Sequence, residues 1–122
     1  MPEFLKRFYS FNDAVIRGLE LHYAASGKKR VSVTLSARDE ESGQAWCNVV
    51  VVIDDVSEIT FREGRATCQV LSSGLVVMWL DESVWCDFSP SIEPNSIEEF
   101  RQSDFYVVGR VVTWRADPYS DQ

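Results

Sequence analysis

A single histidine limits the catalytic chemistry open to this chain of 122 residues. An acyl-transfer triad needs an imidazole, or an equivalent base, held beside its nucleophile. His22 is the only imidazole, and it alternates with Leu21 and Tyr23 on the polar side of a strand-like segment. A solvated strand histidine is therefore expected there. The sequence predicts no catalytic residue, and an enzyme is the least favoured of three function classes.

Two adjacent acidic pairs are the other candidates for chemistry, because paired carboxylates can divide general acid and general base roles. They are Asp54 with Asp55 and Asp81 with Glu82. Neighbours on a strand point to opposite faces, so either pair shares a site only at a turn or bulge. Polar residues that end strands explain both pairs. The same carboxylates can instead form an acidic surface that steers a basic protein partner.

Four tryptophans are the most unusual feature of the composition. Indole side chains favour protein cores, protein interfaces and the walls of ligand pockets. Core packing is the first expectation for all four. The three tryptophans in the C-terminal half are also our candidate binding residues, and they are Trp79, Trp85 and Trp114.

Some predicted strands are apolar on both faces. These are residues 49–53, 75–80 and 105–114, whereas a sheet with one wet face alternates apolar and polar residues throughout. The second face therefore needs cover from a barrel wall, a partner protein or a second copy of the chain. A homodimer is the simplest of these, since two-fold association is the commonest oligomer.

Three cysteines, Cys47, Cys68 and Cys86, lie in apolar stretches without the close spacing of a zinc or redox site. The sequence therefore predicts buried free thiols, with neither metal nor cofactor. An odd cysteine count also argues against secretion.

The charge balance argues against two classes of partner. Twelve basic and nineteen acidic side chains give a formal charge of -7, which repels nucleic acid and anionic membranes. The apolar runs are too short to cross a bilayer, and residues 1–10 carry charges where a signal peptide is apolar. We expect a cytoplasmic protein.

Short alternating segments separated by turns predict the elements that must position these residues. The pattern predicts a short helix in residues 2–9, a second in residues 97–102, and a hairpin of residues 19–23 with 31–38. It predicts further strands at residues 46–53, 59–61, 68–71, 75–80, 84–88 and 105–115, with residues 68–71 and 75–80 as a second hairpin.

The fold class expected from these elements is α+β and mainly β, in one domain over residues 1–122. We predict a curled antiparallel sheet of seven to eight strands with one or two short helices. A roll, a sandwich and a partly open barrel all remain open as forms of that sheet.

The layout resembles small bacterial β-rich domains, including immunity-protein families encoded beside polymorphic toxins. The resemblance rests on Phe11, Asn12, Asp13 and Ala14 leading into the first strand, and on the apolar pattern of residues 55–61. Asn12 stands where that pattern has histidine. The resemblance implies a protein that binds and blocks a toxin. The tryptophans suggest an alternative function, a barrel or roll that binds a small ligand in a tryptophan-lined pocket.

The cysteine pattern makes a chemical prediction. Because buried thiols are shielded from reagents, the native protein should react slowly with a thiol reagent and hold no stoichiometric zinc. Thiol labelling before and after denaturation, together with metal analysis after dialysis, checks this. Three rapidly labelled thiols, or retained metal, would overturn it.

Overall fold

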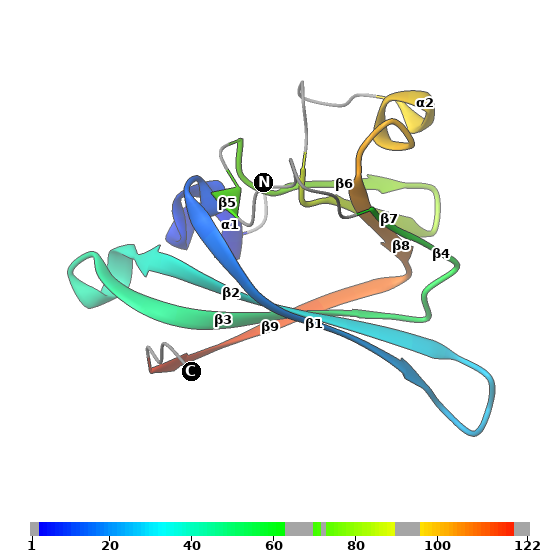
Figure 1. Cartoon of the computed structure of the whole chain (residues 1–122), viewed down its shortest axis with the longest axis horizontal. Coiled ribbons are helices and arrows are strands. Elements are labelled where there is room, and N and C mark those ends of the chain that lie inside the picture. Colours follow the sequence, from blue (N-terminus) through cyan, green and yellow to red (C-terminus); the bar gives the residue numbers. More distant parts are fainter. Residues whose placement is uncertain (1–2, 63–69, 72, 90–95, 119–122) are drawn as a thin grey trace.

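The computed structural model describes residues 3–62, 70–71, 73–89 and 96–118, which contain nine strands in two antiparallel sheets (Figure 1). The large sheet has the order β5-β1-β2-β3-β9, and the small sheet has the order β4-β8-β7-β6. The large sheet consists of β1 (Ala14–Tyr23), β2 (Lys29–Asp39), β3 (Ala45–Asp54), β5 (Val70–Leu71) and β9 (Val111–Pro118). The small sheet consists of β4 (Glu58–Phe61), β6 (Val76–Leu80), β7 (Ser83–Asp87) and β8 (Phe105–Gly109).

Two short α-helices accompany the sheets, α1 (Glu3–Arg7) and α2 (Ile97–Phe100), together with two 3-10 turns at Tyr9–Phe11 and Glu40–Ser42. Ser96 caps α2, because its Oγ accepts a hydrogen bond of 3.3 Å from the Glu99 amide. Within the described ranges, every helix is too short to traverse a bilayer.

The mainly β, antiparallel part of the sequence prediction is confirmed, and so is the hairpin of β1 with β2. The structure has two sheets and nine strands, where a curled sheet of seven to eight strands in the form of a roll, sandwich or partly open barrel was predicted. In the described residues neither sheet is closed or strongly curled.

The last predicted strand, residues 105–115, is in fact two strands in different sheets. The chain leaves the small sheet at Gly109, at the end of β8, and enters the large sheet at Val111. A Cβ on Gly109 would lie 2.4 Å from Ile53 Cγ2 and 2.7 Å from the Asp54 carbonyl oxygen. Only glycine allows so close a crossing, and the alternation alone could not reveal it.

The predicted hairpin of residues 68–71 with 75–80 is also corrected. β5 pairs with Ala14 and Val15 of β1, whereas β6 pairs with β7. After β5 the chain is bound to the N-terminal segment, because the Leu75 amide donates to the Ser10 carbonyl over 2.8 Å. Cys68 and the rest of residues 63–69 lie outside the described residues.

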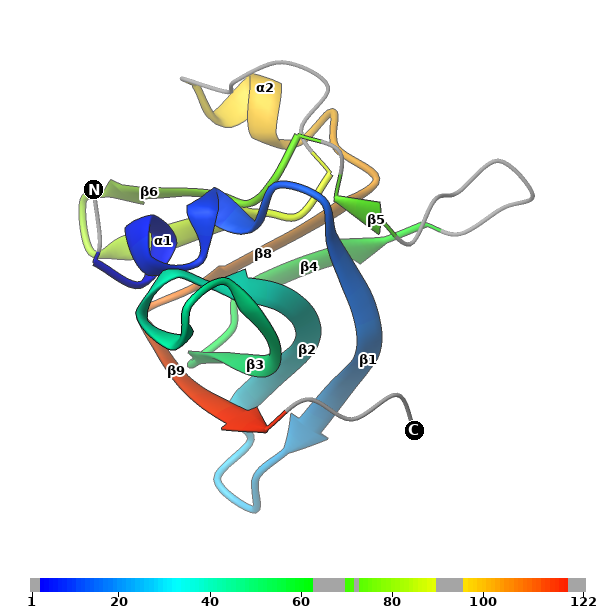
Figure 2. The same cartoon turned by 90° about the vertical axis from the view of Figure 1, so that its left-hand side faces the viewer.

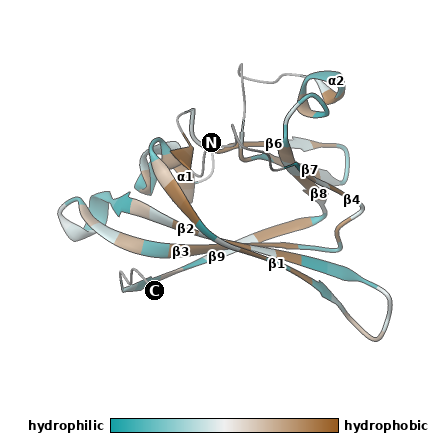
Figure 3. Ribbon diagram, in the orientation of Figure 1, coloured by the Kyte–Doolittle hydropathy of each residue, from teal (hydrophilic) through white to brown (hydrophobic). Residues whose placement is uncertain are grey.

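The main core fills the space between the two sheets. Alternate residues of β2 and β3 face it from the large sheet, and Val84, Cys86, Phe105 and Val107 face it from the small sheet. Figure 3 shows hydrophobic residues along the overlapping strands and hydrophilic residues toward the β1–β2 hairpin. Burial of about a dozen aliphatic side chains at roughly 2 kcal/mol each accounts for the position of the core. Burial also raises the pKa of the Cys86 thiol to about 12.

A second apolar cluster covers the outer face of the small sheet. Trp85, Phe100, Tyr106 and Val108 are all buried there, and Phe100 comes from α2. The second apolar face of the small sheet is therefore covered by residues of the same chain. Val108 and Trp114, which belong to the single strand predicted for residues 105–115, lie in different sheets because of the crossing at Gly109.

An ion pair fastens α1 to the large sheet. Arg7 Nε and Nη2 each donate to an Asp39 carboxylate oxygen over 2.8 Å, and Asp39 is only 2% exposed. Asp39 also accepts from the Glu41 amide and the Ser42 hydroxyl, so it caps the 3-10 turn after β2. Hydrogen bonding from Arg7 holds the pKa of Asp39 well below its usual range.

Replacing Asp39 with Asn should lower the free energy of unfolding by about 2 to 3 kcal/mol, less than for a fully buried pair because Arg7 is partly exposed. A lowered pKa stabilises the fold above the ordinary carboxyl pKa of about 3.9. This contribution is lost as the pH falls below that value toward the folded-state pKa. Urea unfolding should show the difference between wild type and Asp39→Asn shrinking in acid. A constant difference, or an equal effect of Glu40→Gln, would contradict this account.

Candidate functional site

Among the described residues, two concave surfaces offer room for binding. The first, which we call the aromatic groove, has a volume of about 620 Å³ and lies between α1, β6 and β9 (Figure 2). β6 and β9 are the end strands of their sheets, so the groove follows two sheet edges. Its lining is Glu3, Phe4, Lys6, Arg7, Glu40, Glu41, Trp79, Val112 and Trp114. The structure thus brings together two of the three predicted binding tryptophans.

Trp114 is held rigidly on the β9 side of the groove. Its ring stacks on Phe4 with centroids 6.1 Å apart, and Phe8 meets it edge-on at 5.5 Å. The Arg7 guanidinium carbon lies 5.3 Å from the Trp114 ring centroid, which is a cation–π geometry. Trp114 nevertheless stays 37% exposed. Its accessible surface is therefore fixed in place before any partner binds.

Trp79 is the more available indole. It pairs with Val84 in the β6–β7 ladder, and its side chain is 50% exposed. In the described part of the chain, no aromatic ring packs against it. A large rigid indole that the fold itself uses so little is typical of an interface residue.

The charge that remains unpaired at the groove is mostly negative. Arg7 is neutralised by Asp39 and also lies 3.2 Å from a Glu41 carboxylate oxygen. Glu3 and Glu40 are exposed carboxylates, and Lys6 is the remaining lining cation. The groove thus offers two indole faces beside acidic side chains, a combination that attracts a cation.

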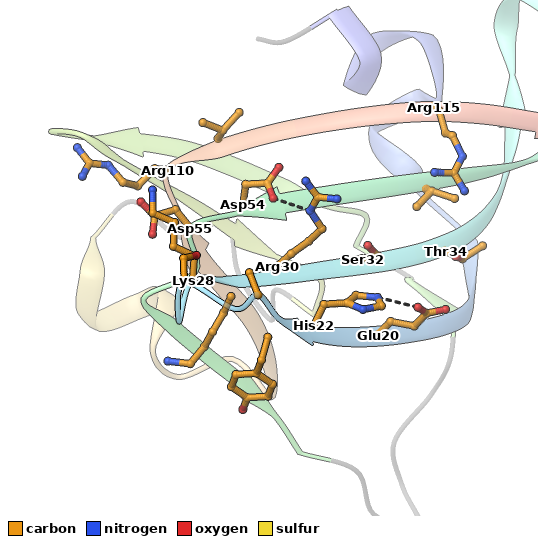
Figure 4. Close-up of a pocket in the computed structure, with 16 residues that line it drawn as sticks. Glu20, His22, Lys28, Arg30, Ser32, Thr34, Asp54, Asp55, Arg110 and Arg115 are labelled. Atoms are coloured by element: carbon orange, nitrogen blue, oxygen red, sulfur yellow. Dashed lines mark hydrogen bonds and ion pairs between the residues drawn. The ribbon is translucent and has the colours of Figure 1, made fainter.

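The second concave surface, which we call the charged hollow, lies over the outer face of the large sheet and has a volume of about 1060 Å³ (Figure 4). Ser32 and Thr34 of β2 form part of its floor, whereas long charged side chains form its rim. The charged lining residues are Glu20, Lys28, Lys29, Arg30, Asp54, Asp55, Arg110 and Arg115.

The predicted acidic residues lie mainly against arginines. Asp54 Oδ1 accepts from Arg30 Nε over 2.6 Å, and Glu82 Oε2 accepts from Arg110 Nη2 over 2.7 Å. Asp54 and Asp55 both line the charged hollow, and Asp54 is engaged by Arg30 there. Asp55 and Asp81 both have positive φ angles, of 56° and 55°, so both pairs mark turns. Two of the four carboxylates, Asp54 and Glu82, are thus paired with arginines.

Trp85 does not join the aromatic groove. It is 5% exposed on the outer face of the small sheet, where it stacks on Tyr106 with centroids 6.2 Å apart and packs against Phe100. Arg101, the residue that follows α2, places its guanidinium carbon 5.5 Å from the Trp85 ring centroid and donates two hydrogen bonds to Glu58. The same Glu58 accepts from the Tyr106 hydroxyl, and the Arg101 hydrogen bonds lower the pKa of Glu58.

Sequence reasoning missed the arginines that define both surfaces. Arg7, Arg30 and Arg115 belong to no motif. The packing of α1 places Arg7 beside Trp114, and strand register places Arg30 and Arg115 in the rows of Asp54 and Thr34. The alternation of β2 does predict that Arg30, Ser32 and Thr34 share one face. The residues of β3 and β9 that lie beside this face are far away in the sequence, so no local sequence pattern predicts them.

The geometry offers little for catalysis. His22 is exposed on β1, and its Nε2 lies 2.8 Å from Glu20 Oε2. No group of three or more metal-ligating side chains occurs in the described ranges. Burial raises the pKa of Asp87, but Ser103 Oγ contacts it at 2.6 Å and the Ser89 amide at 2.9 Å, so it ties two segments together.

The three candidate tryptophans should separate by their effect on stability. Trp85→Ala should cost about 3 to 5 kcal/mol of unfolding free energy because it empties a buried site, whereas Trp79→Ala should cost less than about 1 kcal/mol. Trp114→Ala should fall between them, since its stacking on Phe4 is lost. Urea denaturation followed by circular dichroism measures all three. Equal costs for Trp79 and Trp85 would contradict these assignments.

Comparison of the chain with protein-family models, with curated proteins and with solved structures finds no match.

Proposed function

We propose that this chain is a non-catalytic binding protein of the bacterial cytoplasm that holds a basic protein partner in the aromatic groove. Neutralisation of a toxin, as by an immunity protein, is the form of this role that we propose. The observation that carries the proposal is the pair of exposed indoles, Trp79 at 50% and Trp114 at 37%, that line one groove. Tryptophans are enriched among the few residues that dominate binding energy at protein interfaces.

The rigidity of the groove supports a protein partner. Phe4, Phe8 and Arg7 hold Trp114 from three directions, and the Arg7–Asp39 pair holds α1 beside it. A partner that meets a fixed indole loses less side-chain entropy on binding than one that must order it. Such preorganisation strengthens binding for the same buried area.

The charges support a basic partner. Glu3, Glu40 and Glu41 accompany the indoles, whereas the one lining arginine is already neutralised by Asp39. An arginine or lysine side chain from a partner would lie over the exposed Trp79 ring with a carboxylate nearby. The net charge of -7 would also speed the encounter with a basic protein.

The tryptophan-lined ligand barrel is the less supported alternative. In the described residues neither sheet is closed, and Trp85 is buried among side chains of its own sheet. The indoles that remain exposed line an open groove along two strand edges, a shape better suited to a protein surface than to an enclosed small molecule.

Binding to the product of the neighbouring gene tests this proposal. If that product is a toxin, co-expression of this chain should restore growth, and the two proteins should copurify. Trp79→Ala should weaken the complex by about 2 kcal/mol or more, roughly thirtyfold in Kd, as for an interface hot spot. Association should slow with added salt while dissociation changes little.

Trp46→Ala is the matched control. Trp46 is 39% exposed, but it packs under Arg38 and does not line the aromatic groove. Equal effects of the two substitutions, or absence of both binding and growth protection, would overturn the proposal. Sedimentation of the chain alone is a further check. If the chain alone forms a dimer and Trp79→Glu dissociates it, the groove binds a second copy of the chain and not a basic partner.

A further inference from the structure

The charged hollow contrasts with the charge of the whole chain. Five basic and three acidic side chains line it, so with His22 neutral its lining carries a formal charge of +2, whereas the chain carries -7. Five of the twelve basic residues thus line this one hollow. A local positive field inside an acidic protein selects anions at that point and not elsewhere.

Strand register places two arginines on either side of a row of small side chains. Arg30 pairs with Asp54 across β2 and β3, and Thr34 pairs with Val50, which in turn pairs with Arg115 of β9. Ser32 lies on the same face of β2, between the Arg30 row and the Thr34 row. Figure 4 shows Arg30 and Arg115 with Ser32 and Thr34 below them on the sheet.

The sheet surface beside Thr34 is open. Gly18 of β1 pairs with Thr34 on the side of β2 away from β3 and β9, and a Cβ built on Gly18 would meet no atom within 4 Å. Within the described part of the chain, no side chain donates to or accepts from the hydroxyls of Ser32 and Thr34. Both hydroxyls are therefore available as hydrogen-bond donors to a ligand.

The arginines are oriented and still have donors to spare. Arg30 uses Nε on Asp54, and Arg115 uses Nε on Asp117 over 3.3 Å. Those bonds engage the Nε side of each guanidinium group and leave the Nη groups without a hydrogen bond to a described residue. Paired Nη donors match the oxygens of a phosphate or carboxylate.

From these contacts we propose that the charged hollow binds a compact oxyanion, a phosphate ester or a carboxylate, between Arg30 and Arg115 over the hydroxyls of Ser32 and Thr34. Glu20 and Asp55 also line the hollow and repel an extended polyanion, so the ligand is a small molecule and not nucleic acid. This site is separate from the aromatic groove, and its existence does not depend on a protein partner.

Titration of the full chain with inorganic phosphate and, separately, with citrate tests the site. Amide NMR shifts of Ser32 and Thr34 should change and saturate at millimolar ligand. Saturation by phosphate alone identifies a phosphoryl ligand, and saturation by citrate alone identifies a carboxylate ligand. Arg30→Gln and Arg115→Gln should each weaken binding about tenfold or more, since each removes charge-assisted hydrogen bonds.

Arg38→Gln is the matched control, because Arg38 lies on the same strand β2 but packs over Trp46 outside the hollow. It should leave the affinity unchanged. Thermal unfolding confirms that each variant is folded, which is expected because the Arg30–Asp54 pair is largely exposed. Absence of a saturable shift with either anion would overturn the proposal. So would saturation that all three arginine variants leave unaltered.

Discussion

The close crossing at Gly109 is the constraint on which the rest of the structure depends. Here β8 ends against Ile53 and Asp54 of β3, and the Arg110 amide donates to the Asp54 carbonyl over 3.0 Å. The chain also leaves the large sheet for the small one at this corner, where the Ser57 amide donates to the Val108 carbonyl over 2.9 Å. Two connections at one corner set the spacing of the sheets, and the main core fills the space that they define.

The corner also determines which charges meet. Asp54, Asp55 and Arg110 belong to its two turns, and all three line the charged hollow. Arg110 reaches Glu82 in the β6–β7 turn, which links the hollow to the small sheet. Strand register, and not sequence position, decides which acidic and basic side chains become neighbours. The net charge of -7 therefore does not predict the charge of any one surface.

Local patterns predicted local structure well. Strict alternation in β2 indicated its buried and wet faces, and the Ser96 cap predicted α2 close to its observed position. The same reasoning failed at Gly109 and at β5, because the sheet that a short strand joins depends on contacts far along the chain. It also left the tryptophans unresolved. Trp79 and Trp85 both lie in apolar strands, and the local pattern does not show that Phe100 and Tyr106 cover Trp85 while Trp79 stays exposed.

The aromatic groove depends on both sheets at once. Trp79 belongs to an end strand of the small sheet and Trp114 to an end strand of the large one, so the distance between the indoles is set by the core between the sheets. An end strand alone would present a flexible, aggregation-prone edge. Here α1 lies beside the groove, and Arg7 secures it through a carboxylate that is itself nearly inaccessible to water. Trp114 is thus held at the surface by its contacts with residues of the N-terminal segment and Trp79 by its place in the β6–β7 ladder, and both indoles keep exposed surface for recognition.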